Sequence, residues 1–347
     1  MTNRAGAARD WNPGGVQARL INEFQRNLPL SSRPFRDIAG QLGWSETGVV
    51  AALTDLIQDG VVSRVGPVIR PNTVGASALA AMTVPPHRLA AVAALVTARP
   101  EVNHNYEREH RFNLWFVITA ATAAQLDAAV GNIETGAGLG VMVLPMLDDY
   151  YIDLGFDLNG GDKPGHQQPG MDARALDIDD VDRRLLQAIQ DGLPLTERPY
   201  ESVGMTLGLP EWMVVERLRR LLGAGVVKRL GVIVRHHECG YRHNAMVVWD
   251  VPDHAVHRAG RRLAAENVVR LCYRRPRRPP DWPYNLFCMI HGKDREDVLA
   301  EVGDVACRTG LDSFPRDVLF SARRFKQRGA RYDFNDATAP PPLGARP

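Results

Sequence analysis

Hydrophobic positions follow a helical period and then a strand-like period, and this order occurs twice along the chain. Residues 16–25 and 181–190 carry apolar side chains at helical spacing, and two more helices follow in each half. Ser45 stands where it can cap the third helix of the first half. Strand-like residues 61–69 and 226–234 come next. The pattern predicts two winged helix-turn-helix domains.

After each wing, strands and helices alternate. The matched segments are 79–84 and 245–251, 88–98 and 257–266, 114–119 and 286–291, and 123–133 and 295–308, each set followed by a last strand. This order fits the βαββαβ ferredoxin-like plan, in which helices cover one face of the sheet. We therefore expect an α+β protein, a tandem duplication of winged helix plus ferredoxin-like domain, whose free sheet faces pack together.

A direct repeat supports this division. The run LPLSSRPF that begins at Leu28 returns as LPLTERPY from Leu193, and Gly60-Val-Val returns as Gly225-Val-Val. Ordered matches that include prolines and glycines indicate duplication. The predicted parts are a flexible tail at 1–15, winged helix at 16–69, ferredoxin-like domain at 70–158, linker at 159–177, winged helix at 178–234, ferredoxin-like domain at 235–335 and flexible tail at 336–347.

Composition favours a soluble cytoplasmic protein. The 347 residues are 45% hydrophobic and 24% charged, and the net charge of +2 gives no general attraction to nucleic acid or membrane. The four cysteines lack CxxC spacing, and we find neither a membrane-spanning apolar run nor a signal-peptide core. Only four of the 42 basic residues are lysines. Arginine forks suit carboxylates, although a GC-rich genome explains the same bias.

The most unusual stretch is HNYEREHRFNLWFV, which begins at His104 and includes His110. We expect a hairpin-like turn before Phe112 to bring the two imidazoles together at the end of the sheet. Histidine can give or take a proton near neutral pH, which favours a catalytic role. The alternative is that these are exposed loop residues whose neighbours satisfy them.

Winged helix plus ferredoxin-like domain is also the architecture of the Lrp/AsnC transcriptional regulators, and DRRLL from Asp182 resembles that family. A helix that reads the major groove needs donors for base edges and cations for phosphates. The candidate helix at 45–58 has no lysine or arginine and carries Glu46 and Asp55. The counterpart helix at 211–222 is equivocal, because it carries three arginines but also Glu211 and Glu216. The alternative to DNA reading is that these helices are scaffold or an interdomain wall. A ligand-responsive DNA-binding regulator remains the rival hypothesis.

The histidine stretch, the repeated LPLxxRP run and GYRHNAMVVW from Gly240 together resemble the siroheme decarboxylases of the heme d1 and alternative heme pathways. The resemblance covers about residues 16–158 and 181–334. It implies a carboxy-lyase that removes two acetate carboxyl groups from siroheme without oxidation, giving didecarboxysiroheme, and that needs no cofactor beyond the substrate's iron. The family assembles two related subunits. This chain resembles both subunits on one polypeptide, so we expect the halves to pair, with a homo-oligomer or related subunits as further partners.

The resemblance assigns His104 and His110 as general acid and as orienting group for the reacting carboxyl. A flat substrate with many carboxylates calls for arginine forks around an apolar slot. The candidate substrate-binding residues are Arg64, Arg70, Tyr106, Arg108, Asn113, Trp115, Arg235 and His236. Each arginine has an alternative in a surface ion pair. His236 is a candidate contact to the substrate iron or an ordinary turn residue, and we predict no metal site of the protein's own.

The second half departs from this pattern. Its loop at 271–283 has no histidine, and the block at 270–278 is rich in arginine. Prolines in this loop favour a stiff, extended backbone that forms no groove-reading helix. We expect one catalytic site on the first half's histidine stretch, with the second half contributing contacts to the substrate carboxylates.

Overall fold

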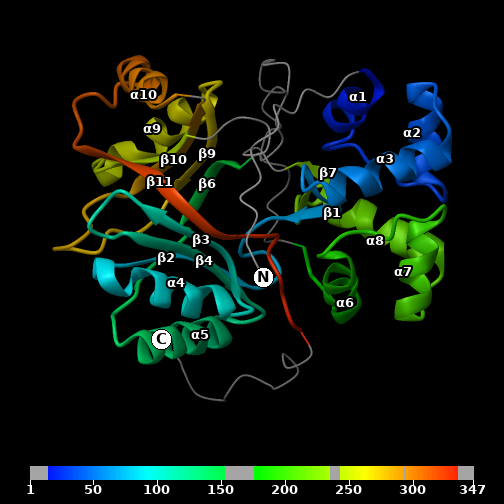
Figure 1. Ribbon diagram of the computed structural model, residues 1–347, viewed down its shortest axis with the longest axis horizontal. Helices are drawn as coiled ribbons and strands as arrows, with labels where there is room; N and C mark the ends of the chain where they lie inside the picture. The colour runs from blue at the N-terminus through cyan, green and yellow to red at the C-terminus, as the bar shows by residue number, and fades with distance from the viewer. Residues whose placement is uncertain (1–14, 153–175, 235–242, 293, 335–347) are drawn as a thin grey trace.

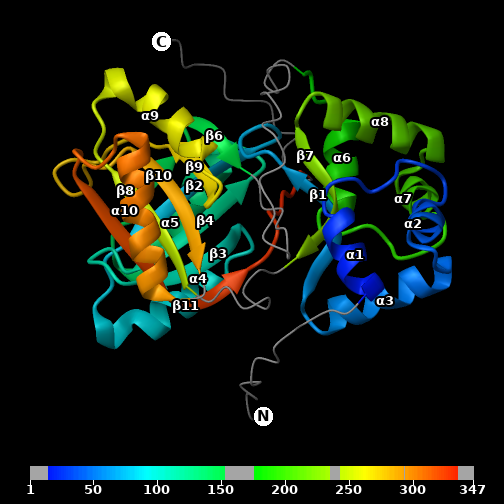
Figure 2. The ribbon, with the colours of Figure 1, turned by 90° about the horizontal axis from the view of Figure 1, so that it is seen from above.

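The computed structural model describes residues 15–152, 176–234, 243–292 and 294–334. They form a winged-helix unit and a larger sheet unit, which lie side by side in Figures 1 and 2. Each unit combines one domain from either half of the chain. Among the described residues, no helix is both long and apolar enough to span a bilayer.

The winged-helix unit repeats three helices and a wing strand. The elements are α1 (Gly15–Glu23), α2 (Pro34–Leu42), α3 (Glu46–Gln58) and β1 (Val62–Ile69), then α6 (Asp180–Ile189), α7 (Pro199–Leu207), α8 (Glu211–Gly223) and β7 (Val227–Val234). Ser45 caps α3 as predicted, because its hydroxyl accepts the Gly48 N–H at 3.0 Å. Gly60 and Gly225 follow α3 and α8 with φ of 78° and 74°, which is the left-handed conformation that glycine adopts without strain.

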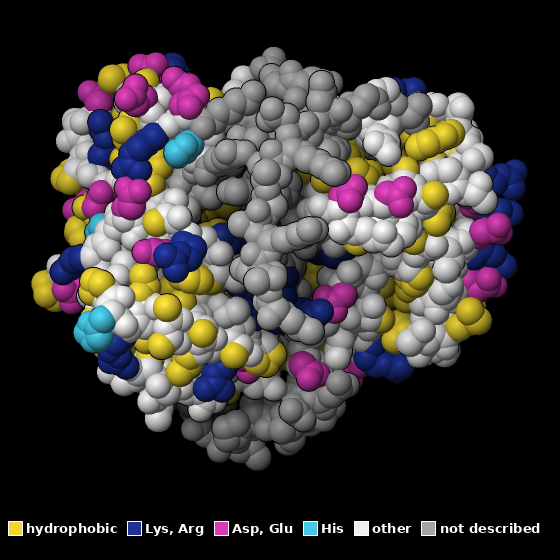
Figure 3. Space-filling model, viewed as in Figure 1, with side chains coloured by type: hydrophobic (Ala, Val, Ile, Leu, Met, Phe, Trp, Pro, Cys, Tyr) yellow, Lys and Arg dark blue, Asp and Glu magenta, His cyan; other side chains and the backbone are white. Residues whose placement is uncertain are grey.

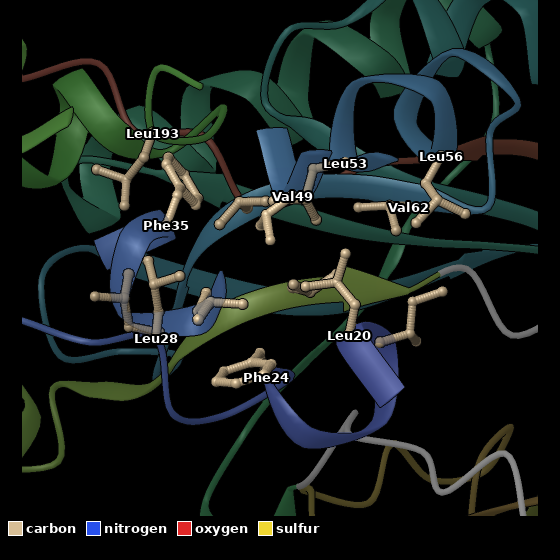
Figure 4. Close-up of a cluster of buried hydrophobic side chains, with 14 of the residues drawn as sticks. Leu20, Phe24, Leu28, Phe35, Val49, Leu53, Leu56, Val62 and Leu193 are labelled. Carbon is tan, nitrogen blue, oxygen red and sulfur yellow. The ribbon is translucent and has the colours of Figure 1, made fainter. Parts of the chain in front are cut away.

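The two wings pair with each other. β1 and β7 run antiparallel, with Gly66 opposite Gly231 at their centre. A β-carbon on Gly231 would lie 2.4 Å from the Phe24 carbonyl oxygen, so the chain approaches too closely for any side chain. One hydrophobic core runs through both winged helices, and Figure 4 shows Leu193 of the second half beside Phe35 of the first.

The sheet unit contains both ferredoxin-like domains. The first supplies β2 (Ala76–Met82), η1 (Pro86–Arg88), α4 (Leu89–Ala98), β3 (Val102–Arg108), β4 (Leu114–Ala120), α5 (Ala123–Ala137), β5 (Met142–Pro145) and β6 (Asp148–Ile152). The second supplies β8 (His243–Trp249), α9 (Asp253–Ala265), β9 (Val269–Arg274), β10 (Leu286–Gly292), α10 (Arg295–Thr309) and β11 (Arg316–Gln327). Their nine strands follow the order β5-β2-β4-β3-β11-β8-β10-β9-β6.

The predicted face-to-face packing of the two sheets is confirmed. An apolar layer that includes Trp115, Leu144, Trp282 and Leu319 lies between them. Helices α4 and α5 cover the outer face of one sheet, and α9 and α10 cover that of the other (Figure 1). The site residues therefore divide between a helix-covered face and an inner layer.

Each half also completes the other's sheet. β11 pairs with β8 up to Phe320 and with β3 from Ser321 onward, with an irregularity in the pairing at the change of partner. In the same way β5 pairs with β2, while the following β6 crosses to β9. Strands that switch sheets make the corners of such a packed pair. The expected pairing of the halves within one chain is present.

Candidate functional site

The first part of the histidine stretch, residues 104–108, lies on β3, a full strand between β4 and β11, and is therefore not the exposed loop of the alternative interpretation. Alternate residues of a strand point to opposite faces. Asn105 points to the helices, because its amide donates to the Ala93 carbonyl of α4 at 3.1 Å. Tyr106 lies opposite Trp115 of the inner layer. His104, Tyr106 and Arg108 therefore share the inner face.

His104 is partly buried there, and its ring meets the Tyr106 ring edge-on at 6.2 Å between centroids. Burial disfavours the imidazolium and lowers the pKa of His104 to about 4. The side chain is therefore neutral at pH 7 in the ligand-free chain. A bound anion beside it would favour the charged form.

The end of β11 contributes residues that the sequence analysis missed. Arg324 lies opposite Tyr106 and Gln327 opposite His104, so both share the face of those residues. The Arg324 guanidinium donates to the Gln327 amide oxygen at 2.9 Å. A hollow of about 200 Å³ opens at 324–327. In Figure 3, Lys and Arg side chains lie along the seam between the two units.

Two buried arginines cross between the halves in the inner layer. Arg108 donates to the Leu319 carbonyl of the second half at 2.8 Å, and Arg275 donates to the Leu144 carbonyl of the first. Their guanidinium carbons lie over tyrosine rings, Arg108 over Tyr106 at 5.8 Å and Arg275 over Tyr273 at 4.6 Å.

Neither arginine has a carboxylate partner among the described residues, and both Nε atoms are buried without a hydrogen-bond acceptor there. Burial lowers the pKa of Arg108 to about 10 and lowers that of Arg275. Buried guanidinium groups without carboxylates are costly for stability, whereas an incoming anion would stabilise them. Arg275 belongs to the basic block at 270–278, and nothing in the sequence distinguishes it from the arginines beside it.

His110 lies in the turn beyond β3. The Phe112 N–H donates to its Nδ1 at 2.9 Å, which leaves the proton of the neutral ring on Nε2, 3.3 Å from an Asp317 carboxylate oxygen. The ring is stacked on Phe112 and meets Trp282 edge-on. Burial is the larger influence and lowers the pKa of His110, although Asp317 opposes it.

The expectation that the two imidazoles lie together is wrong. β3 runs unbroken from His104 to Arg108 before the turn that carries His110. At about 3.3 Å per residue, the four strand steps from His104 to Arg108 separate the α-carbons of these two residues by roughly 13 Å. The turn before Phe112 exists, but His104 lies within the strand. His104 thus lies on β3, whereas His110 lies in the turn after the far end of this strand.

Asn113 has a structural role that argues against substrate contact. Its amide donates to the Val84 carbonyl at 2.8 Å and its oxygen accepts the Val84 N–H at 2.9 Å. Asn285 holds Val251 in the same way in the second half, at 2.9 and 3.0 Å. Both side chains are used in fixing a strand end.

Trp115, another predicted substrate residue, is 1% exposed. Its indole N–H donates to the Phe112 carbonyl at 2.6 Å, and its ring lies 5.1 Å from that of Trp282. This packing supports the wall of the inner layer. Trp115 can therefore shape the site but offers no donor to a ligand.

Arg70 forms an ion pair, which was the alternative to substrate binding. Its guanidinium lies 3.3 Å from the Asp149 carboxylate and also donates to the Gly225 carbonyl. Arg64 donates to the Pro67 carbonyl at 2.8 Å and packs against Gly329, just after β11. Burial lowers its pKa. Arg235 and His236 lie outside the described residues, and their roles stay predictions.

Most arginines of the second half's basic block have protein partners. Arg277 pairs with Asp250 and Asp253, each at 2.7 Å, and Arg278 donates to the Val143 carbonyl. Arg275 differs from these arginines. It lies over Tyr273 of the inner layer and has no carboxylate partner among the described residues.

Comparison with known proteins follows the same division. The model of the AsnC-like ligand binding domain matches residues 74–150 and 238–326, and that of the siroheme decarboxylase NirDL-like HTH domain matches 17–62 and 182–227. The siroheme decarboxylase NirDL subunit of Paracoccus pantotrophus is 45% identical over 319 residues, 91% of this chain and 96% of the relative.

Solved structures give the same result. A crystal structure of the siroheme decarboxylase NirDL superposes with a TM-score of 0.67 at 27% identity, covering 92% of this chain and 94% of that one. A second crystal structure of NirDL, in complex with an iron-uroporphyrin III analogue, superposes with a TM-score of 0.65 at 27% identity, covering 91% and 93%.

Proposed function

The chain belongs to the siroheme decarboxylase family, and we propose that it removes two acetate carboxyl groups from siroheme, giving didecarboxysiroheme for heme d1 biosynthesis. The observation that carries the proposal is the inner face of β3, where neutral His104 lies in line with Tyr106 and buried Arg108. This face combines a group that can carry a proton with a cation that has no carboxylate partner among the described residues.

Arg108 and Arg275 would bind carboxylates of the tetrapyrrole. Their unpaired Nε groups can donate charge-assisted hydrogen bonds, and the ring faces of Tyr106 and Tyr273 beside them suit a flat apolar ligand. Arg324 adds a third cation at the hollow on β11. The NirDL relative that was crystallised with an iron-uroporphyrin III analogue supports a substrate of this class.

The reaction breaks the bond between the CH2 carbon of the acetate and its carboxylate carbon. The electron pair stays with the CH2 carbon and the conjugated ring, CO2 leaves, and one proton forms the new C–H bond of the methyl group. His104 would supply that proton. A carboxylate beside it favours the imidazolium, so the bound substrate would raise a pKa that is about 4 in the free chain. The iron stays part of the substrate and no external oxidant is needed.

His110 would act differently from His104. Asp317 and Phe112 fix the His110 ring, and the backbone N–H of His110 donates to the Arg108 carbonyl at 2.9 Å. His110 therefore holds the end of β3 that carries Arg108. We propose that it positions the substrate carboxyl from that end, the second of the roles that the sequence suggested. Arg235 and His236 remain proposed contacts, the latter to the substrate iron.

The rival function, DNA reading, meets a structural obstacle. The N-terminal residues of a recognition helix contact base edges. At the start of α3, Glu46 pairs with Arg33 at 2.5 Å, and Arg33 also pairs with Glu197 of the other half. At the start of α8, Glu211 pairs with Arg198 and accepts the Ser32 hydroxyl at 3.0 Å. Both helix starts are thus acidic and engaged between the halves.

One anaerobic experiment tests the function. Purified protein is mixed with siroheme, and the masses of the tetrapyrrole are followed over time. We expect two successive losses of CO2, with turnover reduced roughly 10²–10⁴-fold in His104→Ala because a general acid contributes about that much. An unchanged mass together with salt-dependent promoter binding would support the regulator instead.

A further inference from the structure

Two cysteines face each other inside the second half's sheet. Cys272 of β9 lies directly opposite Cys288 of β10. Both are buried, and both belong to the apolar core that α9 and α10 cover. The Cys272 thiol donates to the Gly260 carbonyl of α9 at 3.5 Å. Because opposite residues of an antiparallel pair point to the same face, the two thiols lie side by side under the helices.

The hydrogen bonds nearby show which kind of ladder position this pair occupies. The Arg275 N–H donates to the Asn285 carbonyl of the partner strand at 3.0 Å. The Arg274 carbonyl instead points away from β10 and accepts the Leu147 N–H at 2.9 Å. Hydrogen-bonded and non-hydrogen-bonded positions alternate along an antiparallel ladder, so Cys272, two residues from Arg274, occupies a non-hydrogen-bonded position. Side chains approach most closely at such positions.

The spacing of this pair suits a disulfide. The α-carbons of a non-hydrogen-bonded pair are about 4.5 Å apart, within the range of roughly 4.4–6.8 Å that disulfides span. Cys272 and Cys288 are both thiols in this structure. A bond between their sulfur atoms therefore requires rotation of the side chains but no change of strand register.

All four cysteines lie in the second half, so the first half shows what the duplicated position looks like without them. Both halves carry a tyrosine opposite an aromatic residue at this level, Tyr106 and Tyr273. Just before it, the first half has Asn105 opposite a phenylalanine. Asn105 donates to a carbonyl of α4 as Cys272 does to one of α9. Hydrogen bonding to a helix thus accounts for one cysteine but not for Cys288.

We propose that Cys272 and Cys288 form a reversible disulfide that staples β9 to β10 when the protein meets a peroxide. One thiolate attacks hydrogen peroxide, breaks its O–O bond and becomes a sulfenic acid, and the first water leaves. The other thiolate attacks that sulfur, which forms the S–S bond and releases the second water. The cysteines lose two electrons, the peroxide gains them, and both thiol protons end in the water molecules. A thiol reductant reverses the reaction by exchange.

The edge of the sheet gives the oxidant a route to the buried pair. β9 lies one strand in from the edge, where the short strand β6 of the other half covers it. The Tyr150 ring of β6 packs on Gly260, whose carbonyl the Cys272 thiol contacts. The pairing of β6 is irregular between Asp149 and Tyr151. Local opening costs less than global unfolding, so detachment of β6 exposes Cys272 first, and Cys288 acts as the resolving thiol.

Mass spectrometry of the whole chain tests the pair. Folded wild type is treated with hydrogen peroxide, then unfolded with an alkylating agent and digested. We expect a linkage between Cys272 and Cys288 whose thiols become alkylatable only after dithiothreitol. In the control variant Cys288→Ala the resolving thiol is absent, and dimedone should label a sulfenic acid at Cys272. A linkage that forms only in urea, a linkage to exposed Cys307, or two thiols that stay alkylatable would overturn the proposal.

Thermal unfolding supplies the second measurement. The disulfide closes a ring that contains the arginine loop at 274–283, so the oxidised wild type should melt several degrees above the reduced form. Dithiothreitol should remove this shift, and neither Cys272→Ala nor Cys288→Ala should show it. The same shift in both variants would place the oxidised group elsewhere, and an unshifted wild type would show that no staple forms. Either result contradicts the proposal.

Discussion

His104→Leu would place on β3 the side chain that the second half carries as Leu271, and it should change the acid stability of the protein. The pKa of His104 falls from 6.5 to about 4 in the folded chain, so the unfolded chain binds this proton more readily. The contribution of His104 to the free energy of unfolding is therefore fully present above pH 6.5 and is lost as the pH falls toward 4. Between pH 7 and pH 5 the loss amounts to about 2 kcal/mol.

Urea unfolding at pH 7 and pH 5 measures this difference. Other titrating groups contribute to both proteins, so the relevant quantity is how much more stability the wild type loses than the variant. We expect that excess to be about 2 kcal/mol. His257→Leu, a change at an exposed histidine of α9, controls for the loss of any histidine.

Equal losses in wild type and His104→Leu would refute the reasoning. The imidazole would then be hydrated well enough to charge freely in the folded chain. In that case substrate binding could not raise its pKa by much, and the coupling of substrate binding to protonation would have to be abandoned. Tighter siroheme binding at pH 5 than at pH 7 in wild type alone would support the coupling.

Three further changes probe other parts of the molecule. Asn113→Ala and its matched control Asn285→Ala should each lower the free energy of unfolding by about 1–3 kcal/mol in denaturant, because each leaves buried backbone groups unpaired. A rise in KM for Asn113→Ala alone would show that Asn113 contacts the substrate. Arg108→Met and Arg275→Met should each weaken siroheme binding by roughly tenfold to a hundredfold, because each removes one charge-assisted hydrogen bond. An unchanged affinity in a spectroscopic titration would show that these arginines have a structural role only. Gly231→Ala should lower the melting temperature by several degrees, since its β-carbon would meet backbone atoms of Phe24 and Gln25 at 2.4 Å. An unaltered thermal transition would show that the segment after α1 can move away from β7 at no cost.

The fold was largely predictable because periodicity and duplication are properties of the sequence itself. The apolar spacing indicated three helices and a wing in each half, and Ser45 marked the start of α3 correctly. The two ferredoxin-like sheets followed from the order of strands and helices. These features depend on residues close together in the chain, where local preferences are informative.

The site was harder to predict because it depends on distant pairing. Residues 102–108 are mostly polar and lack a simple alternating pattern, yet they form a strand because β4 and β11 pair with them on both sides. Arg324 and Gln327 reach the same face only through the crossing of β11 from the other half. For Arg70, the sequence left a substrate contact and an ion pair open, and the structure shows the ion pair, because its guanidinium lies 3.3 Å from Asp149.

The exchange of β6 and β11 has a consequence for how such a protein can be encoded. Each half carries a strand that pairs with its neighbour's sheet, so a single backbone cut between Ile152 and Leu176 should leave two fragments that copurify. Two separately encoded chains could then assemble into the same structure as the single chain. Fusion raises the effective concentration of each half near the other but leaves their contacts unchanged, because β-ladders and the apolar layer already hold the halves together.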